Sequence, residues 1–207
     1  MKNAPLATGE IYHVYSKSLA GKVIFNSDRE FLRMKETLKY YLIETDTRFS
    51  LNEGGVRNGA RIVQIMAYCI MSTHVHLILK QLSDDGISRF MSRVLNSYTR
   101  YFNEKYKRKG TLYEGKFKRL IVRSEEYLLH LTRYIHLNPV TAYMVDSPEQ
   151  WTFSSYLEYI GNPGADYFCD FKDFVCMGPE EYANFARATI DYQRSLAAMK
   201  HLLIDDN

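Results

Sequence analysis

Two histidines separated by one residue are the first candidates for chemistry in this chain. They lie in the stretch Thr73-His74-Val75-His76-Leu77-Ile78-Leu79-Lys80. Because side chains along a strand alternate between its two faces, His74 and His76 are expected on the same face, above intervening core residues. Two neutral imidazoles so placed can grip one metal ion. The alternative is a half-exposed strand that carries two histidines by chance, since a pair is less specific than a complete ligand set.

A second group of side chains that could take part in catalysis or metal binding lies in Tyr134-Ile135-His136-Leu137-Asn138-Pro139. Tyr134 and Asn138 are four residues apart and share one face of a predicted helix, as does His130, four residues before Tyr134. A phenol can act as a nucleophile when a nearby cation activates it. The alternatives are strong, because the chain holds 17 tyrosines and Asn before Pro is an ordinary helix-stop signal. His130 and His136 are interpreted as structural or DNA-proximal groups.

A basic segment runs between these two groups. From Arg93 to Arg123 there are ten Lys or Arg against two Asp or Glu, whereas residues 141–207 hold four against eleven. A basic stripe in a nearly neutral chain indicates an anion-binding surface, and interleaved aromatic residues favour single-stranded nucleic acid. The alternative is a solvated helix face. The candidate nucleic-acid-binding residues are Arg100, Lys105, Lys107, Arg108, Lys109, Lys116, Lys118 and Arg119.

The periodicity of apolar residues predicts the elements that must position these side chains. Period-two stretches predict strands, and 3.6-residue periodicity predicts helices. A Gly- and Asn-rich loop is expected at 52–59, the last helix is expected to stop before Asn138-Pro139, and the tail is expected to contain short helices. The order predicts an α+β fold with helices on one face of an antiparallel sheet. The expected strands are 11–16, 61–70, 73–80 and 116–122, and the expected helices are 28–44, 86–104 and 124–137.

Length and composition favour a single globular unit. The 207 residues suffice for one core with a small appendage. No apolar stretch approaches the length of a membrane span, and the N-terminal residues lack the apolar region of a signal peptide. We therefore expect neither a membrane-spanning segment nor a secretion signal. The three cysteines form no CxxC motif. This favours a reduced, cytoplasmic setting over a disulfide framework or a zinc site.

Five short motifs occur along the chain in an order that resembles a known family. The motifs are Tyr12-His13-Val14-Tyr15, then Met71-Ser72-Thr73-His74-Val75-His76-Leu77-Ile78-Leu79, then Gly110-Thr111-Leu112-Tyr113-Glu114-Gly115-Lys116-Phe117-Lys118, then Tyr134-Ile135-His136-Leu137-Asn138-Pro139-Val140, and finally Trp151-Thr152-Phe153-Ser154-Ser155-Tyr156. Together they resemble the single-tyrosine HUH transposases, in particular the REP-associated tyrosine transposases. The resemblance extends from about Gly9 to about Gly161.

The resemblance implies a fold and a set of site residues. It implies a ferredoxin-like (RRM-like) antiparallel sheet with His74 and His76 on a central strand. Tyr134 matches the position of the nucleophile, and Asn138 matches the position that supplies the third metal ligand. The implied cofactor is a divalent ion, Mg²⁺ or Mn²⁺, to which two nitrogen ligands and one oxygen ligand are suited. The expected division is a catalytic domain at 1–145 and a mostly helical C-terminal extension at 146–207, packed on the core.

The activity that the resemblance implies is nicking and joining of single-stranded DNA, with hairpin DNA as partner. Tyr134 would form a 5′-phosphotyrosine and release a 3′-OH, in a monomer or a homodimer. The alternative is a non-catalytic DNA- or RNA-binding module on the same fold. Two motifs depart from the family pattern: Ser72-Thr73 replaces Pro-Asn, and Lys116 replaces an arginine. The first alters a turn, and the second exchanges a bidentate phosphate contact for a point charge.

Overall fold

The computed structural model describes residues 5–45, 47–49, 59–195 and 197. Most of the loop expected at 52–59 and the end of the acidic tail therefore lie outside the described residues. Within the described part of the chain, no helix is both long and apolar enough to span a membrane. The three cysteines are free thiols, with Cys69 buried and Cys176 exposed.

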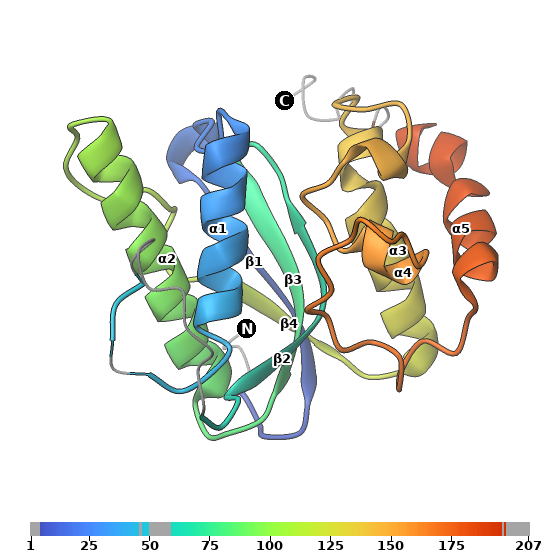
Figure 1. The fold of residues 1–207 in the computed structure, drawn as a ribbon, viewed down its shortest axis with the longest axis horizontal. Coiled ribbons are helices and arrows are strands. Elements are labelled where there is room, and N and C mark those ends of the chain that lie inside the picture. The colour runs from blue at the N-terminus through green and yellow to red at the C-terminus, as the bar shows by residue number, and fades with distance from the viewer. Residues whose placement is uncertain (1–4, 46, 50–58, 196, 198–207) are drawn as a thin grey trace, which may run out of the picture.

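Four antiparallel strands form one sheet in the order β2-β3-β1-β4 (Figure 1). The pair His74 and His76 lies on β3, an internal strand, which confirms the expected placement. With one helix after β1 and another after β3, the strand order is that of a ferredoxin-like fold, as the resemblance implied. The strands are β1 (Ile11–Lys17), β2 (Val63–Ile70), β3 (His74–Gln81) and β4 (Lys118–Val122).

Helices α1 (Asp28–Tyr40) and α2 (Gly86–Lys105) cover one face of this sheet (Figure 1). Their apolar stripes pack on the alternate strand residues that point that way, among them Val75 and Leu77. The sequence predicts helices on one face of the sheet, and α1 and α2 form that layer. A short 3-10 helix, η1 (Leu19–Gly21), follows β1.

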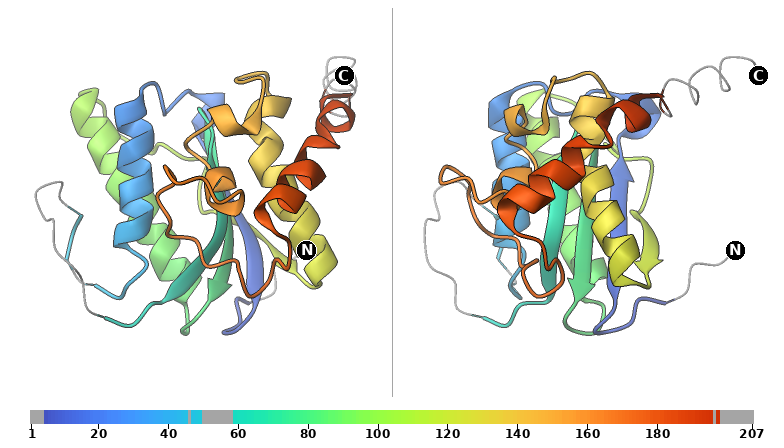
Figure 2. Two further views of the ribbon diagram at one scale, coloured as in Figure 1. Left: turned by 45° about the vertical axis from the view of Figure 1, so that its right-hand side comes forward. Right: turned by 90° about the vertical axis from the view of Figure 1, so that its right-hand side faces the viewer.

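The opposite face of the sheet is also covered by helices, which the sequence-based prediction of a one-sided layer did not include. Helix α3 (Glu125–Thr141), the 3-10 helix η2 (Pro148–Gln150), α4 (Tyr156–Tyr159) and α5 (Pro179–Arg187) lie on this side (Figures 1 and 2). Ala67, Cys69 and Ile78 form a second apolar cluster with residues of α3, α4 and α5. Strand β2 is almost continuously apolar, and such strands are buried on both faces.

Helix α3 continues through Pro139, although the sequence predicts that it stops before Asn138-Pro139. Proline lacks the N–H that would bond to the carbonyl of Ile135 and normally disfavours a helix interior. Here Pro139 and Val140 are buried, and at the C-terminal end of the helix the Ala142 N–H donates to the carbonyl of Asn138. Tertiary packing therefore outweighs the local stop signal. The consequence is that Asn138 lies within the helix, one turn beyond Tyr134.

The described part of the C-terminal extension holds η2, α4 and α5, and the chain is also helical over 190–195. Between α4 and α5 the chain is irregular over 161–178, a segment longer than either helix. Within this segment, the N–H groups of Phe168 and Cys169 donate to the buried carboxylate of Glu158 at 3.1 and 2.9 Å. Helices α3 and α5 lie side by side on the same face of the sheet. The domain division at residue 145 stays a prediction.

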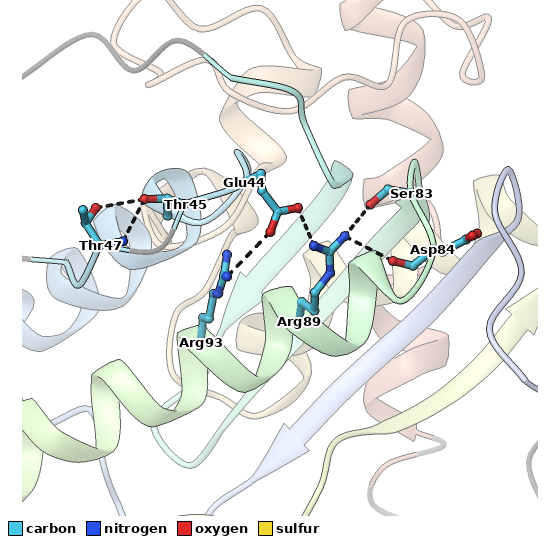
Figure 3. A network of polar contacts seen from close by, with 7 residues as sticks. All are labelled: Glu44, Thr45, Thr47, Ser83, Asp84, Arg89 and Arg93. Carbon is cyan, nitrogen blue, oxygen red and sulfur yellow. Dashed lines mark hydrogen bonds and ion pairs between the residues drawn. The ribbon is translucent and has the colours of Figure 1, made fainter.

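A polar network on the side of α1 and α2 joins the chain after α1 to the start of α2 (Figure 3). The Glu44 carboxylate forms ion pairs with Arg89 and Arg93. Arg89 also donates to the Ser83 hydroxyl at 2.9 Å and to the carbonyl of Asp84 at 3.1 Å. The network fixes the N-terminal end of α2 and lies on the face of the sheet away from α3.

Candidate metal and nucleophile site

The two histidines of β3 share the sheet face that looks toward α3. Their ring centroids are 4.9 Å apart with planes nearly perpendicular. His76 is buried and His74 is half-buried. The neighbours Val75 and Leu77 face the other way, into the core beneath α1 and α2. The strand therefore has the alternating arrangement that its sequence predicts.

In each of these histidines the Nδ1 atom has a protein partner. His76 Nδ1 lies 3.0 Å from Nε2 of His13 on β1, and His74 Nδ1 lies 2.8 Å from the Thr73 hydroxyl. Neither Nε2 atom has a hydrogen-bond partner among the described residues. Burial lowers the pKa of His74 to about 4, with a contribution from Lys17, and lowers the pKa of His76 well below its usual value. Both rings are therefore neutral near pH 7, the form that binds metal.

Tyr134 extends from α3 to the edge of this histidine pair. Its ring centroid lies 6.2 Å from that of His76, with the planes at 82°, and the side chain is 43% exposed. Partial burial, followed by the nearby Tyr15 phenol, raises the pKa of Tyr134 above its usual value. The phenol is consequently protonated at neutral pH and must lose its proton as it attacks a substrate.

Asn138 lies one helical turn beyond Tyr134 and is half-buried. Its side-chain nitrogen is buried and has no hydrogen-bond partner in the described part of the chain. A half-turn of the amide exchanges nitrogen and oxygen, so this unsatisfied group can instead present an acceptor. Among the described residues no three His, Cys, Asp or Glu side chains are grouped to hold a metal. The oxygen of an asparagine amide is a suitable further ligand beside two imidazoles.

A buried network holds α3 against the sheet and the C-terminal extension. His136, two residues beyond Tyr134, is fully buried, and its Nδ1 and Nε2 atoms lie 2.7 Å from the hydroxyls of Tyr182 and Ser155. The Ser155 hydroxyl accepts from the Tyr68 N–H of β2 at 2.9 Å. His136 is thus a structural group, one of the two roles expected for it. It links the helix that carries Tyr134 to α5 and to β2.

Replacing Tyr182 with Phe is expected to destabilise the fold through this network. The change leaves a buried imidazole nitrogen unsatisfied, which costs about 1–3 kcal/mol of unfolding free energy. Urea unfolding of the variant measures this loss. Tyr192→Phe is the matched control, because Tyr192 is 66% exposed and its hydroxyl loss should change stability little. Equal stability of Tyr182→Phe and the wild type would contradict the role assigned to the network.

Three lysines surround a small hollow beside the histidine pair. In the strand register, His76, Tyr15 and Lys118 lie in one row across β3, β1 and β4. Lys118 Nζ lies 5.9 Å from the Tyr15 ring centroid. A hollow of about 160 Å³ next to this row is lined by Tyr15, Ser16, Lys17, Glu114, Gly115, Lys116 and Lys118. Lysine clusters of this kind are suited to phosphate oxygens.

The other predicted DNA-binding residues are more widely spread. Lys105 forms an ion pair of 2.7 Å with the buried carboxylate of Glu30. Arg108 donates to the side chain of Asn103 and the carbonyl of Thr111, and so ties the loop after α2. Arg100 lines a hollow with Arg93 on the α1 and α2 side. Lys107 and Lys109 are exposed in the loop, and Arg119 and Lys116 line a groove of about 600 Å³ against α2.

His130 does not join the group with Tyr134, although helical spacing placed it on the same face. Its Nδ1 lies 2.9 Å from an Arg133 nitrogen, and its ring lies 5.7 Å from that of Phe185 on α5.

Two residues near the site were given no role on sequence grounds, namely His13 and Lys17. The sequence did carry a signal for His13, because His13 and Tyr15 share one face of β1 as His74 and His76 share one face of β3. The cross-strand register that brings the two pairs together is not readable from one strand alone.

Comparisons with known proteins agree with this architecture. Residues 58–138 match the family model described as "Transposase IS200 like". A curated protein of Haemophilus influenzae, "Putative REP-associated tyrosine transposase", is 26% identical over 104 residues, which cover 45% of this chain and 58% of that protein. This chain therefore aligns with somewhat over half the length of that relative.

A solved structure described as a REP-associated tyrosine transposase bound to a REP hairpin has the same fold. The TM-score is 0.56 at 16% sequence identity, and the match covers 84% of this chain and 93% of the other. The matched family segment contains both β3 histidines, Tyr134 and Asn138. Residues 58–138 of this chain match the model of the IS200-like transposase family, and the chain as a whole resembles the REP-associated tyrosine transposases.

Proposed function

We propose that this chain is a metal-dependent endonuclease and strand transferase for single-stranded DNA, using Tyr134 as its nucleophile. The observation that carries the proposal is the position of the Tyr134 ring, 6.2 Å from a histidine whose Nε2 is unpaired among the described residues. A nucleophile, two available metal-binding nitrogens and a lysine-lined hollow are thus grouped on one sheet face. The match of residues 58–138 to a transposase family model supports DNA as the substrate.

The ligand set has a defined chemical task. His74, His76 and Asn138 would hold a divalent ion, Mg²⁺ or Mn²⁺, which polarises the scissile phosphate and offsets charge that develops during attack. Burial keeps both imidazoles uncharged, so each can give a nitrogen lone pair to the ion without first losing a proton. Three protein ligands leave open positions for phosphate oxygens and water.

Tyr134 would carry out the covalent step. Its oxygen attacks the phosphorus, the bond from phosphorus to the 3′ oxygen breaks, and the departing 3′ oxygen takes up a proton while the phenol loses one. The product is a 5′-phosphotyrosine with a free 3′-OH, and the reverse attack by a 3′-OH rejoins a strand without a further energy source. An exposed position on α3 suits a nucleophile that must meet a macromolecular substrate.

Hairpin DNA with unpaired flanks is the proposed partner. The described match to a transposase bound to a REP hairpin supports this class of substrate, because that protein shares the fold. Lys17, Lys116 and Lys118 would contact the backbone of the strand that reaches Tyr134. The rival function is binding of DNA or RNA without cleavage. It accounts for the lysines but leaves the paired imidazoles and Tyr134 without a role.

A nicking assay distinguishes the two functions. Labelled hairpin oligonucleotides with randomised single-stranded flanks are incubated with the protein in Mn²⁺ or in EDTA and separated on a denaturing gel. The proposal expects cleaved strands and a protein-linked product in Mn²⁺ only. Tight hairpin binding with neither product in Mn²⁺ would instead support the non-catalytic module. Monomeric or dimeric assembly and a cytoplasmic location stay predictions.

Replacing Lys116 or Lys118 with Ala is expected to weaken hairpin binding and to reduce its salt dependence. Each lost phosphate contact lowers the slope of log K against log salt by about 0.7–0.9. Fluorescence anisotropy at several salt concentrations measures this slope. Lys172→Ala is the matched control, since Lys172 is an exposed lysine on the C-terminal extension. An unchanged slope in both site variants would remove the hollow from the DNA path.

A further inference from the structure

His13 on β1 is buried and directed at a presumed metal ligand rather than at solvent. It is 6% exposed, and its Nε2 lies 3.0 Å from Nδ1 of His76. The two rings meet edge to edge and are nearly coplanar, with centroids 5.2 Å apart and planes at 20°. Register explains the contact, because His13 pairs with Ile78 and Tyr15 pairs with His76 on the same sheet face. The proposed chemistry does not use His13.

A hydrogen bond between two neutral imidazoles needs one donor nitrogen and one acceptor nitrogen. If His13 donated, His76 would accept at Nδ1 and carry its own proton on Nε2, which would block that atom as a metal ligand. If His76 donates from Nδ1, its Nε2 keeps a free lone pair. Only the second arrangement leaves His76 able to bind metal without breaking the contact with His13.

We propose that His13 is a positioning residue, which accepts the Nδ1 proton of His76 and thereby presents His76 Nε2 to a divalent ion. This inference rests on the proposed function and adds a residue to it. Outer partners of this kind fix the tautomer and orientation of a metal-binding histidine and raise its basicity. The Thr73 hydroxyl lies 2.8 Å from the Nδ1 of His74 and can accept its proton in the same way. Both metal-facing atoms are then Nε2.

Packing against a neighbouring ring supports a positioning role. The tilted ring of Tyr15 packs against both imidazoles, with its centroid 5.4 Å from that of His13 and 5.8 Å from that of His76. These packed rings limit rotation of His76 about its side-chain bonds. A ring that is held in this way loses less freedom when metal binds.

Two measurements on the full chain test the inference. The first is a long-range ¹H–¹⁵N NMR correlation of the metal-free protein, with the signal of His76 assigned by its loss in His76→Gln. The second is the Mn²⁺ dissociation constant by titration for the wild type, His13→Phe and His13→Gln. Phe keeps a flat ring but accepts no hydrogen bond, whereas the Gln oxygen can accept one. His130→Phe is the control, because His130 is exposed and pairs with Arg133.

The expected results are a proton on Nδ1 of His76, and Mn²⁺ binding weakened about 10–100-fold in His13→Phe. Binding by His13→Gln is expected to lie closer to the wild type, and His130→Phe is expected to match it. A proton on Nε2 of His76 would overturn the inference, as would wild-type affinity in His13→Phe. If the wild type bound no Mn²⁺, the proposed metal site would fail, and the NMR result would still decide the role of His13.

Discussion

Tyr134→Phe is expected to abolish the covalent protein–DNA product and to leave hairpin binding within about twofold of the wild type, a change of less than about 0.5 kcal/mol. The variant lacks the only atom that attacks phosphorus, and removal of a nucleophile can cost on the order of 10⁶-fold in rate. The side chain is 43% exposed and its hydroxyl has no hydrogen-bond partner within the described residues, so the fold should not change. Product formation is measured on a denaturing gel, and binding by anisotropy.

The same helix offers a closely matched control. Tyr127 of α3 is also 43% exposed and also phenolic, but it lies at the N-terminal end of the helix, beside the Ser124 cap. Tyr127→Phe is therefore expected to form the covalent product at the wild-type rate. An undiminished yield in Tyr134→Phe would exclude Tyr134 as nucleophile. A loss in both variants would indicate damage to α3 rather than loss of chemistry.

His74→Ala is expected to reduce nicking by at least about 100-fold, more than loss of an outer-shell partner costs, while hairpin binding persists. His74 is the better choice for this test than His76, because it is half-buried and the only hydrogen-bond partner of its side chain among the described residues is the adjacent Thr73. EDTA should reproduce the loss in the wild type, and added Mn²⁺ should reverse it. Initial nicking rates over a Mn²⁺ titration make the measurement.

The control for this second experiment is His130→Ala, which removes an exposed histidine of α3. Its nicking rate should follow the wild type at every Mn²⁺ concentration. If His74→Ala nicked at the wild-type rate in limiting Mn²⁺, the histidine pair would not be the metal site. The Tyr134 and His74 experiments thus separate the nucleophile from the metal, because a failure of one leaves the other intact.

The local elements of this protein could be predicted because they depend on short-range periodicity. The alternation in residues 73–80 predicts a strand with both histidines on one face, and β3 has that arrangement. The apolar repeat after Gly86 predicts α2, and the acids after Ser124 predict the start of α3. Strand and helix periods are properties of the backbone and can be read without knowledge of neighbours.

Contacts between distant segments could not be read in this way. The sequence predicts a helix end before Pro139, whereas burial of Pro139 and Val140 carries α3 onward and keeps Asn138 in helical geometry. Lys105 reads as a free cation, yet it pairs with Glu30, 75 residues earlier in the chain. The first outcome requires packing energy that outweighs the local penalty of about 3 kcal/mol for a proline in a helix interior. The second depends on how α1 and α2 pack together, because Glu30 lies on α1 and Lys105 on α2.

The sequence by itself determined the chemical inventory and the motif order: two histidines on a strand face, a tyrosine and an asparagine one helical turn apart, and a basic segment between them. The tertiary structure alone decided how these parts meet. It placed α3 on the opposite side of the sheet from α1 and α2, set the Tyr134 ring 6.2 Å from His76, and brought His13 into contact with His76 across two strands. The physical reason is that period and spacing fix the face of one element, whereas strand register and the docking of helices depend on burial of apolar surface from the whole chain.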